Sequence, residues 1–299
     1  MRASIVATLI VPPLLWGSNA VVGRLAAGLI PPITLNTLRW TVALLILLPL
    51  FLRIATPAHR SIIRRHARTL LLGAFCGITC YNGLQYLALT TSSAINVSLI
   101  GAATPAFILL VGRFVFGEPI SRIAALGAFI STLGVIWIMI GGQLQNLFNV
   151  RFAAGDLFML AGTVVWSVYT WMLRRDRSGL APIALLTVQI FAGVLLSLPF
   201  LLIQNALGIY APVTWSTKEI LIVLYVGVFP SLVAFFCWQR AVATTSAQLP
   251  VFFMNLTPIF TVVLSVFALG ETPRLFHYIG LVLILSGIAC AHAGTVQKK

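Results

Sequence analysis

The sequence predicts an all-α integral membrane protein with ten transmembrane helices, arranged as two inverted five-helix repeats with both termini in the cytoplasm. Three observations support this prediction: an apolar composition, apolar runs of helical length, and an internal repeat. Of the 299 residues, 60% are hydrophobic and 8% are charged, whereas a soluble domain carries about 25% charged side chains. This composition excludes a water-soluble globule.

The apolar runs are long enough to cross a membrane as helices. A helix of about 20 residues spans the hydrocarbon core, and the runs lack the polar and apolar alternation of barrel strands. Pro32 and Pro182 stand where helices are expected to begin, and Ser93 and Ser246 can cap helix N-termini. We expect spans at about residues 4–23, 32–52, 69–89, 94–116, 123–141, 155–173, 182–203, 219–241, 247–268 and 275–293.

The basic residues are distributed unevenly between the two sides, which predicts the orientation. Under the positive-inside rule the basic side faces the cytoplasm, so both termini are expected there. The net charge of +14 then reflects topology and attraction to anionic lipid headgroups, and no nucleic-acid surface is expected. The basic residues expected on that side are Arg2, Arg53, Arg60, Arg64, Arg65, Arg68, Arg113, Arg122, Arg174, Arg175, Arg177, Arg240, Lys298 and Lys299.

The second half of the chain repeats the first. Residues 91–118 align without a gap on residues 244–271, including an internal Thr-Pro pair and a final Gly-Glu pair in each. We expect one repeat at residues 1–145 and another at residues 146–299. Because each repeat has an odd number of spans, the second enters the membrane inverted, which is an architecture of transporters.

The repeat also bears on the first apolar run, which resembles a signal peptide in its length and flanks. Trp16 and Arg24 of this run recur as Trp166 and Arg174 at a separation of 150 residues. This recurrence favours a retained first span over a cleaved signal peptide.

Each repeated stretch contains a proline in a predicted helix interior. Pro105 cannot donate to the Gly101 carbonyl, and Pro258 leaves the Met254 carbonyl without its helical donor. Gly101, Pro105 and Pro258 are therefore candidate hinges that open a cavity alternately to each side. The alternative is a static kink that improves packing.

Four sequence stretches carry a family resemblance. They are PLLWGSNAVVGRLA, PPITLNTLRW, and the ATP…GE and LTP…GE ends of the fourth and ninth spans. Together they resemble the EamA repeats of the drug/metabolite transporter superfamily, over essentially the whole chain. The resemblance implies a ten-helix exporter of small metabolites in the bacterial cytoplasmic (inner) membrane. Within that superfamily the chain is similar to the YddG-like branch of aromatic amino acid exporters.

Polar and aromatic residues at membrane depth are the candidates for substrate binding. Amides, hydroxyls and rings form a neutral lining that suits a zwitterion with an apolar or aromatic side chain. For each residue the alternative is packing between helices. The candidates are Trp16, Asn19, Tyr81, Asn82, Gln85, Tyr86, Trp166, Tyr169, Trp238, Gln239 and Asn255.

Arg39 is the strong charge expected inside a span. It is a candidate partner for a substrate carboxylate. The alternative is that it snorkels outward or donates to helix-end carbonyls beside Asn36.

The positions of the acidic residues bear on energy coupling. All five acids lie at span ends or in loops, at Glu118, Asp156, Asp176, Glu219 and Glu271. A proton-coupled antiporter needs a buried carboxylate, so we expect a facilitator or uniporter of neutral, aromatic amino acids. The alternatives are export of another metabolite, such as a cysteine-pathway compound or a purine, and a proton-coupled drug or metabolite antiporter.

The sequence contains no CxxC, HExxH or GxSxG motif. We therefore expect no disulfide, no metal, no cofactor and no enzymatic activity. The expected partners are a small-molecule substrate and the lipid bilayer, and the sequence leaves the oligomeric state open.

Overall fold

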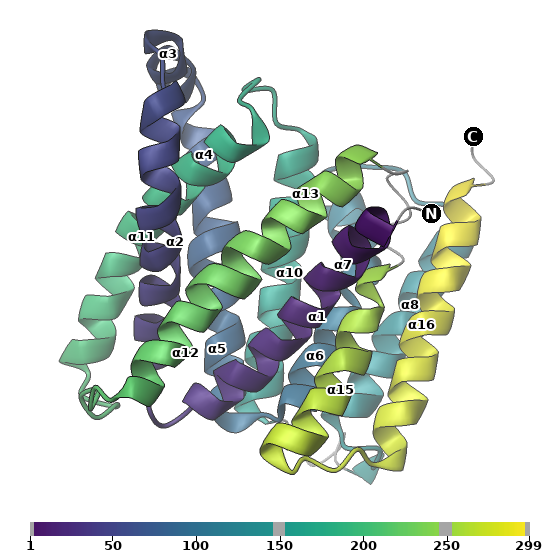
Figure 1. Ribbon diagram of the computed structural model, residues 1–299. Coiled ribbons are helices and arrows are strands. Elements are labelled where there is room, and N and C mark those ends of the chain that lie inside the picture. The colour runs from purple at the N-terminus through teal and green to yellow at the C-terminus, as the bar shows by residue number, and fades with distance from the viewer. Residues whose placement is uncertain (1–2, 146–152, 245–252, 297–299) are drawn as a thin grey trace.

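The computed structural model describes residues 3–145, 153–244 and 253–296, and within these ranges all regular secondary structure is helical (Figure 1). Seven helical segments are long and apolar enough to cross a membrane, and the bent pair α6 and α7 makes an eighth candidate. Two shorter apolar helices follow. Each of the ten predicted spans thus contains a described helix, and the ten-span count itself stays a prediction.

The first half of the chain contains helices α1 (Ala3–Ala26), α2 (Pro32–Ile54), α3 (Pro57–Arg65), α4 (Ala67–Ala74), α5 (Tyr81–Thr91), α6 (Ala94–Ala102), α7 (Thr104–Phe114) and α8 (Arg122–Met139). The second half contains α10 (Ala154–Arg174), α11 (Pro182–Ala206), α12 (Thr217–Val228), α13 (Ala234–Thr244), α15 (Leu256–Leu269) and α16 (Leu275–Val296). Two π-helical segments, η1 (Phe75–Cys80) and η2 (Phe229–Val233), interrupt the third and eighth predicted spans.

Helix α3 is an element that the sequence analysis treated as a connection. Thr56 begins it, with its N–H donating to His59 Nδ1 at 3.2 Å, and proline follows at the first helical position. Its apolar residues Ile62 and Ile63 pack on a small core cluster that includes Leu70. Helix α3, the start of α1 and the end of α16 all lie at the upper end of the bundle in Figure 1, which we call the α3 end.

The two π-helical segments occupy matched places, because η2 falls within residues 228–233, which align with η1 at a separation of 153. A wider turn leaves carbonyls for other donors. Asn36 donates to the Ile78 and Thr79 carbonyls at 3.3 and 3.2 Å. The Trp16 indole donates to the Pro230 carbonyl at 3.0 Å. Neighbouring spans thus stabilise both interruptions.

The predicted break in the fourth span is present, two residues before the proline. Helices α6 and α7 meet at Ala103 with a bend of 48°. Pro105 is therefore in the first turn of α7, where its missing N–H costs little. The Thr104 hydroxyl donates to the Gly101 carbonyl at 2.6 Å and replaces the donor that proline lacks.

The ninth span is interrupted in the same way. A turn at Asn255 precedes α15, and Pro258 lies in the first turn of that helix. At the repeat separation of 153 residues the two breaks lie within one residue of each other, and movement at either of them stays a prediction.

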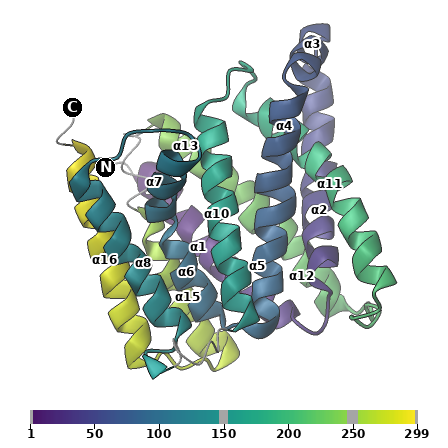
Figure 2. The ribbon, with the colours of Figure 1, turned by 180° about the vertical axis from the view of Figure 1, so that it is seen from behind.

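The main helix contacts join the first half of the chain to the second. Helix α1 packs on α13 and α15, α10 packs on α5 and α7, and α2 packs on α11. Helices α8 and α16 lie side by side in both views (Figures 1 and 2). The two halves therefore interleave instead of folding as separate bodies.

Glycines bring α8 and α16 into close backbone contact. A β-carbon at Gly134 would lie 2.9 Å from the Gly280 carbonyl oxygen, and one at Gly287 would lie 2.5 Å from the Gly127 carbonyl oxygen. Small residues on facing helices allow such an approach in membranes, where packing replaces the hydrophobic effect as the driving force.

Replacing Gly287 by valine should therefore push α16 away from α8. Overpacking of this kind costs about 1–3 kcal/mol, so we expect a lower midpoint of thermal unfolding for the purified protein in detergent. Ser286→Val is the matched control, because Ser286 is exposed on the same helix. An equal midpoint for Gly287→Val and Ser286→Val would contradict this account of the interface.

Candidate functional site

A cavity of about 490 Å³ lies between the two halves, within the range of about 300–1,000 Å³ typical of ligand sites. Most predicted site residues line it: Trp16, Asn19, Arg39, Tyr81, Asn82, Gln85, Gly101, Pro105, Trp166, Tyr169, Trp238, Asn255 and Pro258. Tyr86 does not line the cavity and lies directly behind the lining residues Asn19 and Arg39, 2% exposed. The Gln239 side chain lies outside the described residues.

Arg39 is the centre of the polar wall. Its Nη1 donates to Asn82 Oδ1 at 2.9 Å and to the Tyr86 hydroxyl at 3.1 Å. Its Nε donates to the Ser231 hydroxyl at 2.6 Å. The guanidinium also lies over the Trp40 ring, 4.9 Å from its centroid. Neutral groups from α5, η2 and α2 itself therefore hold this cation.

The hydrogen bonds continue from Arg39 to the first span. The Tyr86 hydroxyl donates to Asn19 Oδ1 at 2.9 Å, and Asn19 Nδ2 donates to Gln85 Oε1 at 3.2 Å. We call Arg39, Asn82, Tyr86, Asn19 and Gln85 the polar wall. Asn82 and Tyr86, four residues apart on α5, both hold the Arg39 side chain.

Arg39 is 1% exposed, so the alternative in which it snorkels outward is wrong. The alternative in which Arg39 donates to helix-end carbonyls beside Asn36 is also wrong, because its hydrogen bonds go to the side chains of Ser231, Asn82 and Tyr86. Burying a cation without a paired anion is costly. Such a cost is characteristic of a site that receives an anionic group.

The acidic residues are engaged elsewhere. Glu118 pairs with Arg175 at 2.7 Å, Asp156 accepts a hydrogen bond from Ser92, and Asp176 accepts one from Ser178. Glu219 caps its own helix at Ser216, and Glu271 accepts from backbone N–H groups. Within the described ranges, Arg39 therefore has no carboxylate partner.

Two aromatic clusters face the same cavity. Trp166 lies 4.6 Å from Tyr81 and 5.2 Å from Tyr169, measured between ring centroids. Trp16 lies 5.7 Å from Phe235 and 5.8 Å from Trp238. Trp16 and Trp166 are matched positions of the repeat, so each half supplies the central ring of one cluster.

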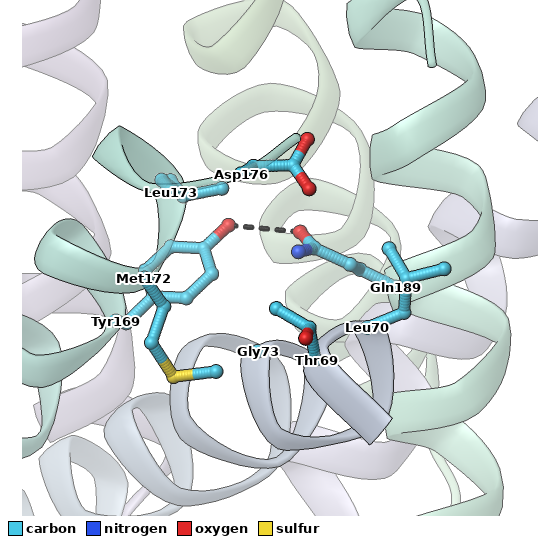
Figure 3. A pocket seen from close by; sticks show the side chains of 8 residues that line it. All are labelled: Thr69, Leu70, Gly73, Tyr169, Met172, Leu173, Asp176 and Gln189. Carbon is cyan, nitrogen blue, oxygen red and sulfur yellow. Dashed lines mark hydrogen bonds between the residues drawn. The ribbon is translucent and has the colours of Figure 1, made fainter. Parts of the chain in front are cut away.

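A hydrogen bond between Tyr169 and Gln189 bounds the cavity on one side. The Tyr169 hydroxyl donates to Gln189 Oε1 at 3.0 Å, and both side chains line the cavity. They also line a small pocket of about 10 Å³ with Thr69 and Asp176 (Figure 3), enough for about one water. Gln189 was missed in the sequence, although an amide within the apolar seventh span is the same signal that indicated Asn19.

At the end of the bundle opposite α3, hydrogen bonds join the two halves of the chain. Glu271 accepts the N–H groups of Ala94 and Ile95 at 2.9 and 3.1 Å, at the start of α6. His277 Nε2 lies 3.0 Å from Asn96 Oδ1. We call this group the Glu271 latch, and it joins the α15–α16 connection to α6.

Arg24 strengthens the same end. Its Nη1 donates to the carbonyls of Leu89 and Thr90 at 2.7 and 3.1 Å, tying the end of α1 to the end of α5. At the α3 end, by contrast, the cavity lining continues to Leu173 and Leu180, which lie at the end of α10 and before α11. The cavity thus extends toward the α3 end.

Comparisons with known proteins agree with this architecture. Residues 3–140 and 153–292 each match the EamA-like transporter family. A transporter from Archaeoglobus fulgidus is 30% identical, with 72% of each chain covered. A probable terminal-alkyne amino-acid exporter from Streptantibioticus cattleyicolor is 25% identical, with 79% of this chain and 77% of its own chain covered. The aromatic amino acid exporter YddG from Ancylobacter novellus is 24% identical, with 93% of each chain covered.

A solved crystal structure also aligns with the whole chain. It covers 100% of both chains with a TM-score of 0.64 at 23% sequence identity. At this identity the likeness supports the fold alone.

Tyr86→Phe tests the polar wall. The change removes an acceptor from Arg39 and leaves Asn19 Oδ1 without its donor, and an unsatisfied buried polar group costs about 1–3 kcal/mol. We expect the midpoint of thermal unfolding to fall. Tyr278→Phe is the control, because Tyr278 is 53% exposed. If both variants unfold at the wild-type temperature, the wall does not contribute to stability as described.

Proposed function

Because the chain belongs to the EamA-like transporter family, we propose that it exports neutral, aromatic amino acids across the bacterial cytoplasmic membrane by alternating access. Membership of this family indicates a transporter and not an enzyme. The observation that carries the choice of substrate is the cavity, which combines the buried Arg39 cation with two aromatic clusters.

The chemistry of the cavity supports an amino acid with a ring. A guanidinium binds a carboxylate through charge-assisted hydrogen bonds, and the clusters around Trp166 and Trp16 offer faces and edges for stacking. The volume of about 490 Å³ accommodates a molecule of this size. The names of two relatives, an aromatic amino acid exporter and a probable exporter of another amino acid, point to the same class.

Matched contacts support two inverted repeats of five spans, at residues 1–145 and 146–299. Exchanging the halves turns the α1 contacts with α13 and α15 into the α10 contacts with α5 and α7. In the sequence it also aligns η1 with η2, and it brings the break at Ala103 within one residue of the turn at Asn255. An exchange symmetry of this kind is the basis of alternating access, with Gly101, Pro105 and Pro258 as hinges.

In the proposed orientation the α3 end faces the cytoplasm. This assignment follows from the arginines gathered around α3. The Glu271 latch then closes the external side, and the cavity is directed toward the cytoplasm, where an exporter takes up its substrate. Glu118, the match of Glu271, is paired with Arg175 in this state.

We further propose that transport is passive. Among the described lining residues of the cavity there is no acidic side chain, and each of the five acids has the other partners given above. A group that exchanges a proton for substrate is therefore missing from the site, which favours a facilitator over a proton antiporter.

The substrate proposal is tested by uptake of radiolabelled phenylalanine and tryptophan into liposomes that hold the purified protein. We expect saturable uptake, absent from protein-free liposomes and unchanged when a pH gradient is imposed. Strict dependence on the pH gradient would contradict passive transport. Uptake of purines or cysteine-pathway compounds, with none of aromatic amino acids, would contradict the proposed substrate.

Glu271→Gln tests the latch. The amide keeps one acceptor oxygen and loses the negative charge at the helix N-terminus, so the closed end should open more often. The measurement is labelling of Ala20→Cys, a cavity position, by a membrane-impermeant thiol reagent added outside. Losing about 1.4 kcal/mol of latch energy corresponds to about tenfold more open molecules, so we expect labelling to accelerate by about this factor.

The background for this experiment replaces the native cysteines Cys76, Cys80, Cys237 and Cys290 by alanine. Glu118→Gln is the matched control, since it makes the same change at the symmetry-related position. Unchanged labelling in Glu271→Gln, or equal acceleration in Glu118→Gln, would show that Glu271 does not hold the external side closed.

A further inference from the structure

We infer that the cavity recognises the carboxylate and the ring of its substrate and does not require the amino group. Its substrate class therefore includes aromatic monocarboxylates that lack an amine. This inference rests on the proposed function, because it takes the central cavity as the substrate site. It follows from the charge of the cavity and from the hydrogen-bonding state of the polar wall.

The charge of the cavity is positive. Arg39 is the one ionised group among the described residues that line it, and the remaining lining residues are neutral. A monoanion balances this charge. A zwitterion brings in addition an ammonium group, which the guanidinium repels and which finds no carboxylate in the lining, so its favourable contacts are limited to rings and neutral polar groups.

The polar wall offers donors more than acceptors. The three amide oxygens of the wall each already accept a hydrogen bond: Asn82 Oδ1 from Arg39, Asn19 Oδ1 from Tyr86, and Gln85 Oε1 from Asn19. The side-chain nitrogens of both asparagines also donate hydrogen bonds. Asn19 Nδ2 donates to Gln85 Oε1, and Asn82 Nδ2 donates to the Gly77 carbonyl at 3.0 Å.

Two donors of the wall have no partner among the described residues. They are Arg39 Nη2 and Gln85 Nε2, whose neighbouring atoms Nε, Nη1 and Oε1 are all engaged. Two N–H groups from residues that line one cavity suit the two oxygens of a carboxylate. An ammonium, which carries donors and no acceptor, meets on this wall only amide oxygens that each already accept one hydrogen bond.

The clusters around Trp166 and Trp16 provide the remainder of the site. They contact a ring irrespective of whether the carbon next to the carboxylate carries an amine. Binding energy is therefore expected to follow the carboxylate and the ring, and specificity among neutral amino acids to follow the ring.

Three ligands of similar size separate these contributions: phenylalanine, phenylpropanoate, which lacks the amine, and phenethylamine, which lacks the carboxylate. Their dissociation constants are measured by tryptophan fluorescence of the purified full-length protein in lipid nanodiscs at neutral pH. We expect phenylpropanoate to bind as tightly as phenylalanine or more tightly. Phenethylamine should bind at least about tenfold more weakly, because it loses a charge-assisted pair.

Variants at Arg39 identify the group responsible. Arg39→Lys keeps the charge and should keep the preference for phenylpropanoate over phenethylamine, whereas Arg39→Gln should abolish it. Arg113→Gln is the control, because Arg113 is exposed on α7 and outside the cavity, and it should bind all three ligands like the wild type. The wild-type ligand series decides the matter alone if a variant at Arg39 fails to fold.

The outcomes distinguish this inference from the proposed function. Binding of phenylalanine without binding of phenylpropanoate would overturn the inference and leave amino acid transport standing. Binding of phenylpropanoate without phenylalanine would support the inference and overturn the amino acid assignment. Equal binding of phenethylamine and phenylpropanoate, or binding of none of the three, would overturn the inference.

Discussion

The organisation of this protein depends on one buried cation. Arg39 is held inside the bundle by Asn82, Tyr86 and Ser231, from the third and eighth predicted spans. Neutral partners satisfy the hydrogen bonds of a guanidinium and leave its charge uncompensated. The cavity between the two halves therefore carries an uncompensated positive charge, which favours the binding of an anion. The neutral lining residues and the aromatic clusters surround this charge.

Some of the residues that stabilise the backbone interruptions also form the site. A membrane helix that departs from regular α geometry must find donors for the freed carbonyls within the protein. Asn36 supplies them for η1 and Trp16 for η2, while Thr104 supplies its hydroxyl to Gly101. Because Trp16 and Thr104 also line the cavity, the residues that stabilise the interruptions are in part those that shape the site. Movement at the interruptions would therefore change the cavity directly.

Much of this arrangement is predictable from the sequence, because a polar residue in an apolar run must face protein or water. Most of the polar and aromatic residues selected by that rule line the cavity, and the repeat located both breaks. It did not distinguish Tyr86, one layer behind the lining, from Gln85 on the cavity, since both satisfy the rule. Helix α3 was missed because it is short and basic and has no apolar run. The π-helical segments depend on donors from other spans, which no local pattern records.

A structure of the protein with bound phenylalanine tests the central claim most directly. The position of the ligand carboxylate relative to the Arg39 guanidinium is the quantity to measure. The account predicts a carboxylate oxygen at hydrogen-bonding distance, about 2.7–3.0 Å, from a guanidinium nitrogen, with the ring against the cluster of Trp166 or that of Trp16. A ligand whose carboxylate lies away from Arg39, or whose ammonium lies nearest to the polar wall, would contradict it.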